Sequence, residues 1–229
     1  MVMKMPEILY EDNHIIAINK RSSELAQGDK TGDEALDDQL KKYIAKKYNK
    51  PGDVFLGVVH RLDRPVSGVL LYARTSKALQ RLNELFKSRQ VKKIYWAVVK
   101  ERPPEDEATI THFLKKNESQ NKSYVYESEV KGSKQASLSY KVLGRSERYY
   151  LLEIELHTGR HHQIRAQLAA IGCPIKGDMK YGFPRSNEDG SISLIAKKIS
   201  FTHPVKKEEM EIIAPLPVTD IWNAFRDVI

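Results

Sequence analysis

The chain has 229 residues, enough for one large domain or two small ones. Its 38 Lys and Arg against 30 Asp and Glu leave a formal net charge of +8. This surplus favours a polyanionic partner, although a soluble basic protein is the simpler interpretation. The single cysteine, Cys173, excludes an intramolecular disulfide. No stretch approaches the roughly 20 apolar residues of a membrane helix, and the N-terminus lacks the apolar core of a signal peptide. We therefore expect a cytoplasmic protein that does not enter the membrane.

The first predicted elements alternate between strand and helix. Residues 14–20 are a short apolar run of strand length. Residues 31–48 are expected to form a helix, because Thr31 and Glu34 have the spacing of a capping box. Apolar residues then recur at helical spacing, at Leu36, Leu40 and Ile44.

The remaining elements are predicted from the same kinds of pattern. A strand over 68–74, an amphipathic helix over 76–91 and a strand over 92–100 come first. The polar stretch 114–135 indicates an exposed hairpin or loop pair. Then follow two strands within 137–157, a helix over 158–172 ended by Gly172, strands within 193–204 and 209–217, and a short terminal helix around Trp222 and Phe225.

Strands outnumber helices in this order, and several successive strands have short connections. These features favour an α+β fold, with a mixed, largely antiparallel sheet and helices flanking it. No break in composition forces a domain boundary. We therefore expect a single catalytic-sized domain over residues 1–229.

The segment "HRLDRPVSG" (60–68) places one carboxylate, Asp63, between Arg61 and Arg64. A nearby cation lowers the pKa of a carboxylate, and an arginine can fix its orientation. A carboxylate nucleophile or an electrostatic stabiliser needs both effects. The alternative is an Asp in a turn, bonded to its own backbone. A serine nucleophile at Ser67 is disfavoured, because the segment lacks the GxSxG pattern.

A second segment, residues 157–165, gathers three histidines and two arginines. His157 and His161 have the i, i+4 spacing of a metal-binding pair. However, no HExxH pattern accompanies them, and the interleaved arginines would repel a dication. We therefore expect no metal site. The simplest alternative is a helix N-terminus whose basic residues face solvent.

Taken together, "HRLDRPVSG", "TGRHHQIRAQL" and "GCPIKGDMKYG" resemble the RluA-type RNA pseudouridine synthase family. Further pieces of the resemblance occur in order along nearly the whole chain, at "IIAINK", "SKALQRLNELFKSRQVKKIYWAVV" and "LIAKKISFTHP". The resemblance implies a catalytic domain with a central cleft that isomerises specific uridines in rRNA or tRNA to pseudouridine. The reaction would need no cofactor or metal, and the target base would be flipped out of its stack. The resemblance implies no separate N-terminal RNA-binding domain, and we expect a monomer.

The resemblance also implies roles for single residues. Asp63 corresponds to the catalytic carboxylate, which attacks either the anomeric carbon of the sugar or carbon 6 of the uracil. Arg165 corresponds to the arginine that pairs with this Asp. Tyr95 corresponds to the tyrosine that packs against the uracil and helps to remove the proton from carbon 5, although a core aromatic is the alternative. The expected RNA contacts are Arg61, which would fill the space of the flipped base, and Arg64, Arg160, His161, Lys115 and Lys116.

Lys115 and Lys116 lie in the polar middle segment with Lys122, Lys131 and Lys134. We interpret this segment as a mobile element that closes on RNA, with a solvated loop as the alternative. Three departures from the family pattern are also visible. The usual Lys-Pro-x-Gly turn after the first strand is absent, since Arg21 follows Lys20 and neither the Pro nor the Gly is present. Val66 replaces a Thr, and Ile195 replaces a His.

Two other functions stay open from the sequence. One is an RNA-binding or ribosome-assembly protein that uses this fold without turnover. The other is a carboxylate-dependent hydrolase that acts on free nucleosides. A chain that only binds RNA has no need for Asp63, Tyr95 and Arg165 together, which favours the isomerase.

Overall fold

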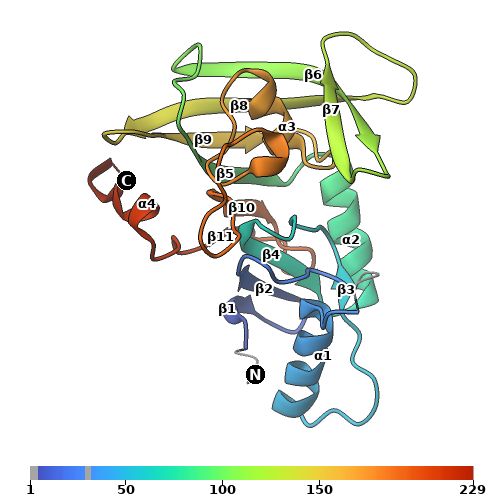
Figure 1. Cartoon of the computed structure of the whole chain (residues 1–229). Coiled ribbons are helices and arrows are strands. Elements are labelled where there is room, and N and C mark those ends of the chain that lie inside the picture. The colour runs from blue at the N-terminus through green and yellow to red at the C-terminus, as the bar shows by residue number, and fades with distance from the viewer. Residues whose placement is uncertain (1–4, 29–31, 229) are drawn as a thin grey trace. The chain divides into compact units, whose positions relative to one another are not determined.

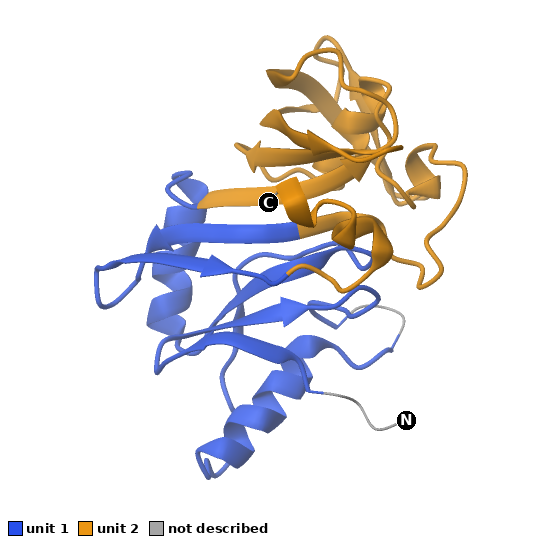
Figure 2. Ribbon diagram, turned by 90° about the vertical axis from the view of Figure 1, so that its left-hand side faces the viewer, with its two compact units in different colours: residues 1–91, 196–215 blue, residues 92–195, 216–229 orange. Residues whose placement is uncertain are grey.

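The computed structural model describes residues 5–28 and 32–228, which form two compact units. Figure 2 distinguishes them by colour: the first comprises Met1–Val91 and Ala196–Pro215, and the second comprises Lys92–Ile195 and Leu216–Ile229. The expectation of a single catalytic domain over residues 1–229 stays a prediction.

The first unit is built on antiparallel strands with two helices (Figure 1). Its core order is β1-β2-β4-β10, with β3 beside β4 and β11 beside β10. The bounds are β1 (Glu7–Glu11), β2 (Ile15–Lys20), α1 (Leu36–Lys47), β3 (Gly57–Val58), β4 (Ser67–Ala73), α2 (Ser76–Lys87), β10 (Leu194–Thr202), which enters from the second unit, and β11 (Glu209–Ile213).

The predicted apolar strands form the core of this unit. β2 runs against β4, with Ile15 opposite Ala73 and Lys20 opposite Gly68. Residues Ile15–Ile18 are fully buried, which explains why the run reads as continuously apolar. α2 begins as its sequence predicts: the Thr75 hydroxyl accepts a 3.1 Å bond from the amide of Ala78.

The predicted start of α1 is wrong. The helix begins at Leu36, after an extended Ala35, rather than at residue 31. The Leu36 amide donates to the carbonyl of Leu25 at 2.8 Å, so a tertiary contact fixes this end of the helix. Thr31 lies outside the described residues. The predicted buried face is confirmed, because Leu36, Leu40 and Ile44 are fully buried.

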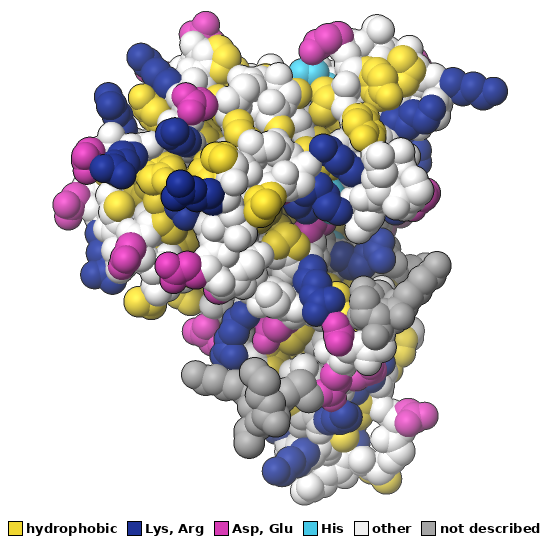
Figure 3. Space-filling model, in the orientation of Figure 1, with side chains coloured by type: hydrophobic (Ala, Val, Ile, Leu, Met, Phe, Trp, Pro, Cys, Tyr) yellow, Lys and Arg dark blue, Asp and Glu magenta, His cyan; other side chains and the backbone are white. Residues whose placement is uncertain are grey.

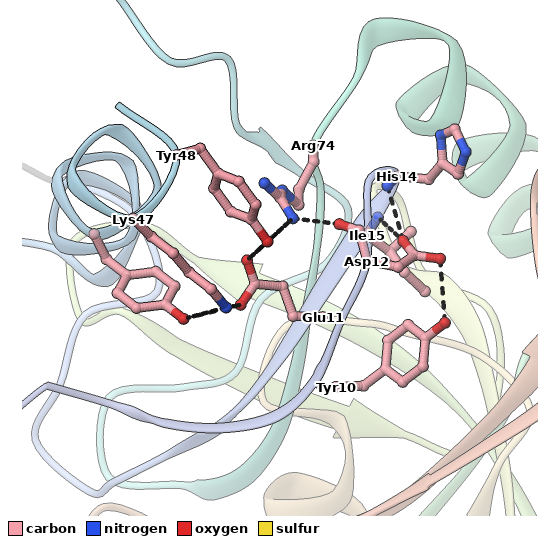
Figure 4. A network of polar contacts seen from close by, with 9 residues as sticks. Tyr10, Glu11, Asp12, His14, Ile15, Lys47, Tyr48 and Arg74 are labelled. Atoms are coloured by element: carbon pink, nitrogen blue, oxygen red, sulfur yellow. Dashed lines mark hydrogen bonds and ion pairs between the residues drawn. The ribbon is translucent and has the colours of Figure 1, made fainter. Parts of the chain in front are cut away.

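A polar network ties the end of α1 to two strands (Figure 4). Glu11 of β1 accepts a 3.0 Å bond from Arg74, just after β4, in an ion pair that is almost fully buried. Lys47 of α1 reaches the other oxygen of Glu11 at 2.6 Å, and the Tyr48 ring lies 4.6 Å from the Arg74 guanidinium. Through Lys47, this network fixes the C-terminal end of α1.

The second unit contains an antiparallel sheet of order β5-β9-β8-β6-β7. Its elements are β5 (Lys92–Val99), β6 (Glu107–Asn117), β7 (Lys122–Tyr126), β8 (Lys134–Arg145), β9 (Tyr150–Leu156), α3 (Gln163–Ala170), the 3₁₀ turn η1 (Met179–Tyr181), α4 (Asp220–Asn223) and the 3₁₀ turn η2 (Arg226–Val228). The predicted hairpin is confirmed as β6 and β7, in which Asn117 faces Lys122.

α3 is shorter than predicted, because it begins at Gln163 rather than near residue 158. His162 stands before it in the left-handed region with φ of 53°, where a right-handed helix cannot continue. The predicted end is confirmed at Gly172, which has a φ of 81° directly after the cap residue Ile171. The amides of Gly172 and Cys173 bond the carbonyls of Ala169 and Leu168, as in a Schellman motif.

These elements confirm the α+β fold class with a largely antiparallel sheet. Within residues 5–28 and 32–228, no helix is long and apolar enough to cross a membrane. β1 was not predicted, since its sequence "EILYE" is short and largely half-exposed.

Candidate active site

Asp63 lies in a tight turn between β3 and β4. The Val66 amide donates to the Asp63 carbonyl at 3.0 Å, which closes the turn. Leu62 and Val66 on either side are buried, whereas Asp63 is half-buried and Arg61 is exposed. The buried side chains anchor the segment, so the carboxylate is presented from a fixed backbone.

Lys20, the last residue of β2, holds this turn from within. Its side chain is fully buried, and its ammonium donates to the carbonyls of Arg21 at 2.9 Å, Arg64 at 3.0 Å and Val66 at 2.7 Å. Burial lowers the pKa of Lys20 to about 8, while the negative charges of Glu24 and Asp63 act in the opposite direction. The Lys20 ammonium therefore feels the negative charge of the Asp63 carboxylate.

Arg64 connects the same turn to the segment after β2. Its Nη2 lies 2.8 Å from Asp33 Oδ2, and its Nε donates to the carbonyl of Ser23 at 3.2 Å. The Ser23 amide in turn bonds the Arg64 carbonyl at 2.9 Å. The stretch "RSSEL", which departs from the family pattern at Arg21, is thus fastened to the Asp63 turn. RNA contact by Arg61 and Arg64 stays a prediction.

The backbone after the turn passes close to β10. Gly68 has a φ of 112°, and a Cβ at this position would lie 2.7 Å from the backbone nitrogen of Ala196 and closer still to its carbonyl oxygen. No other residue fits this position without moving a strand. The departures at Val66 and Ile195 are both buried apolar side chains, at 2% and 0% exposure.

Tyr95 and Arg165 belong to the second unit. Tyr95 lies on β5 opposite Ile154 and is buried, at 8% exposure. This environment fits either a core aromatic or the wall of a pocket. The neighbouring Trp96 donates from its indole nitrogen to Glu153 at 3.2 Å. The roles of Tyr95 and the pairing of Arg165 with Asp63 stay predictions.

Arg165 forms a buried, two-point ion pair with Asp178. Arg165 Nε lies 2.6 Å from Asp178 Oδ2, and Arg165 Nη2 lies 2.9 Å from Asp178 Oδ1. The two residues are 5% and 1% exposed. Such a fork fixes the plane of the guanidinium as well as its position. Asp178 was missed in the sequence, although it lies in the quoted motif "GCPIKGDMKYG".

The histidines of the second segment are used in hydrogen bonds. His157 Nε2 lies 2.7 Å from the hydroxyl of Ser139, and His161 Nδ1 lies 2.9 Å from that of Ser123. Both histidines precede α3, so they do not form a helical i, i+4 pair. Throughout the described ranges, no cluster of three or more His, Cys, Asp or Glu is placed to hold a metal ion.

The remaining predicted RNA-contacting residues lie around the β6–β7 hairpin. Arg160 donates to the carbonyl of Gln135 at 2.9 Å, and Lys116 pairs with Glu118 at 2.6 Å. Lys115 and Lys116 are exposed, and Arg160 is half-buried. In Figure 3, basic side chains lie beside hydrophobic ones at the upper right, over this hairpin. Their contact with RNA stays a prediction.

Two structural findings therefore define the chemistry available. The first unit presents a carboxylate from a turn held by a buried ammonium, and the second holds an arginine in a fixed orientation. The first arrangement suits a reaction that starts with an oriented carboxylate.

Comparisons with known proteins point to one family. The family model described as RNA pseudouridylate synthase matches residues 14–170. The chain is 32% identical over 216 residues to a protein of Buchnera aphidicola named ribosomal large subunit pseudouridine synthase C, covering 91% of this chain and 66% of that protein. It is 30% identical over 238 residues to one of Pectobacterium carotovorum named tRNA pseudouridine synthase C, covering 96% of this chain and 60% of that protein.

A solved structure, described as human RNA pseudouridylate synthase domain containing 4, shares the fold. It has a TM-score of 0.80 and 22% identity, and the match covers 97% of this chain and 92% of that one. The chain belongs to the RNA pseudouridylate synthase family. It spans two thirds or less of the length of the two bacterial relatives.

Proposed function

We propose that the chain is an RNA pseudouridine synthase, an isomerase that converts specific uridines of rRNA or tRNA into pseudouridine. The observation that carries the proposal is the Asp63 turn, whose flanking carbonyls are fixed by the buried ammonium of Lys20. Membership of the family supports the reaction class. The names of the two bacterial relatives support rRNA and tRNA as the substrate classes.

In the proposed mechanism the target uridine leaves its stack, and Asp63 attacks either the anomeric carbon or carbon 6 of the uracil. The bond between the sugar and nitrogen 1 breaks, the uracil turns in place, and carbon 5 joins the sugar. The bond between Asp63 and the substrate breaks again, so the carboxylate is regenerated. Carbon 5 finally loses its proton, and nitrogen 1 gains one, so the product is an isomer of the substrate. Arg165 orients and stabilises the carboxylate, and Tyr95 packs against the uracil and assists the proton transfer.

The basic net charge supports RNA as the partner. A net charge of +8 attracts RNA, and phosphate contacts by Arg61, Arg64, Arg160, Lys115 and Lys116 would make its affinity fall with salt. His161 is also expected to contact the RNA. We propose a monomer that works in the cytoplasm, with no metal or cofactor.

The test is a tritium-release assay on rRNA and tRNA transcripts labelled at carbon 5 of uridine. Wild-type protein is expected to release tritium, whereas Asp63→Asn binds the same RNA with similar affinity and releases none. Asp53→Asn, which changes an exposed Asp outside the turn, is the matched control and is expected to behave as wild type.

Release by Asp63→Asn at the wild-type rate would remove Asp63 from the mechanism. Binding without release by the wild-type protein, on all transcripts, would favour the RNA-binding alternative. Turnover of free uridine would favour the hydrolase.

A further inference from the structure

Tyr181 lies at the centre of a set of contacts that the mechanism above does not use. It ends the 3₁₀ turn η1, three residues after Asp178, and it is only 8% exposed. The Tyr181 amide donates to the Asp178 carbonyl at 3.1 Å. The backbone that carries the partner of Arg165 is therefore bonded directly to that of Tyr181.

The hydroxyl of Tyr181 joins the β6–β7 hairpin to the residue before α3. It accepts a 2.8 Å bond from the backbone amide of Ser123 on β7. It also lies 3.0 Å from Nδ1 of His162. Burial, helped by the positive charge of Arg165, lowers the pKa of His162 to about 2, so this imidazole is neutral at physiological pH. The hydroxyl can then donate to Nδ1 while it accepts from the amide, so both of its contacts are satisfied.

The ring of Tyr181 lies within reach of two cations. The guanidinium carbon of Arg165 is 5.1 Å from the ring centroid, and the ammonium of Lys122 is 5.2 Å from it. Both distances are within the range of cation–π attraction. One side chain therefore contacts the predicted catalytic arginine and the first residue of β7.

The turn of the hairpin is fastened beside Tyr181. Lys180 donates to the carbonyls of Gln120 at 3.5 Å and Asn121 at 3.2 Å. His161 Nε2 lies 3.0 Å from the side-chain oxygen of Asn121. The hairpin that bears Lys115 and Lys116 is thus docked on the same segment that orients Arg165.

We propose that Tyr181 is a positioning residue that links docking of the β6–β7 hairpin to the orientation of Arg165. Its hydroxyl holds the hairpin, and its ring supports the guanidinium that Asp178 fixes from another direction. Because RNA is expected to contact this hairpin, the link would couple RNA binding to the assembly of the active site. The inference rests on the proposed function and adds to it a residue that acts through Arg165.

The test separates the hydroxyl from the ring. Tyr181→Phe keeps the ring and loses both hydrogen bonds, so the Ser123 amide should exchange with solvent about tenfold faster and KM for RNA should rise about tenfold. The rate at saturating RNA should fall less than about threefold, because the ring contact remains. Tyr181→Leu loses the ring as well, and its saturating rate should fall about tenfold or more.

Tyr124→Phe is the matched control, since it removes another hydroxyl of the same hairpin, one that bonds Gln120. Exchange at Ser123 and KM should both stay within about twofold of wild type, since this bond lies outside the link. A Tyr181→Phe protein with wild-type exchange and wild-type KM would overturn the proposal. So would a Tyr181→Leu protein that melts at a lower temperature but keeps the wild-type saturating rate.

The amide-exchange measurement does not depend on turnover. If wild-type protein forms no pseudouridine, the proposed function fails. Exchange at Ser123 then still reports whether Tyr181 holds the hairpin.

Discussion

The ammonium of Lys20 lies 2.7 Å from the carbonyl oxygen of Val66, although 46 residues separate them along the chain. This contact, with the parallel one to Arg64, makes the end of β2 the support of the Asp63 turn. A buried ammonium is a costly support, and here three carbonyls compensate its charge.

Lys20→Met should therefore lower the free energy of unfolding. Three carbonyls, of which that of Val66 is buried, lose a charged donor, which costs about 2–4 kcal/mol. Turnover should fall as well, because the Asp63 turn loses its anchor. Urea denaturation and the tritium-release assay check both effects, with the exposed Lys50→Met as control. Equal unfolding midpoints for Lys20→Met and wild type would contradict the role given to Lys20.

Asp178→Asn should strongly lower the free energy of unfolding, although the two side chains are almost equal in size. It breaks the buried two-point ion pair between Asp178 and the guanidinium of Arg165, at a cost of about 3–5 kcal/mol. The double variant Arg165→Met with Asp178→Leu should recover most of this stability, because it buries no charge, yet it should remain inactive. Thermal melting of the single and double variants measures the recovery. If the double variant is no more stable than Asp178→Asn, the loss of stability does not come from breaking the Arg165–Asp178 ion pair.

Gly68→Ala should destabilise the first unit by about 3 kcal/mol or more. The new Cβ would meet the backbone nitrogen of Ala196 at 2.7 Å, and the φ of 112° is strained for any residue with a side chain. Gly28→Ala is the control, since a Cβ there would have nothing within 4 Å and the φ of Gly28 is not positive. Comparable melting temperatures for the two variants would show that β4 and β10 can separate at Gly68 without cost.

Asp12 should make stability depend on pH in the acid range. Burial raises the pKa of Asp12, but hydrogen bonds from the His14 and Ile15 amides, Lys206 and Tyr10 outweigh it and lower the pKa to about 2. A carboxyl whose pKa falls on folding stabilises the protein above about pH 4, and this contribution is lost as the pH falls toward 2.

Asp12→Asn cannot titrate, so the difference in free energy of unfolding between wild type and variant should shrink from pH 4 to pH 2. Denaturation at several pH values measures it. A difference that stays constant over this range would show that the ionised form of Asp12 contributes nothing.

The sequence predicted the elements whose signal is local. β2, β4 and β5 are buried apolar runs, and α2 carries its own N-cap at Thr75. The starts of α1 and α3 could not be predicted, because distant contacts determine them. Leu25 takes the first amide of α1, and Gln163 receives bonds from the Thr158 hydroxyl and the Arg160 amide that keep residues before it out of the helix.

In the candidate site, too, residues with a local signal were found, whereas residues that depend on distant partners were missed. Asp63 was found because two arginines flank it in the sequence, and Arg165 was assigned through the resemblance to the pseudouridine synthase family. Lys20, Asp178 and Tyr181 were not assigned roles, because their partners lie 46, 13 and 58 residues away and only folding brings them together. A lysine that closes an apolar strand, as Lys20 does, is the one local signal that could have drawn attention to this support.

The bond from the Ser123 amide to the Tyr181 hydroxyl has a further consequence for solubility. β7 is the last strand of its sheet order, and strands in that place can recruit an extended segment from another molecule. Here a side chain of the same chain already occupies the Ser123 amide, and the strand is only five residues long. An incoming strand would have to displace Tyr181 before it could pair at this point, so the contact also protects the protein against edge-to-edge aggregation.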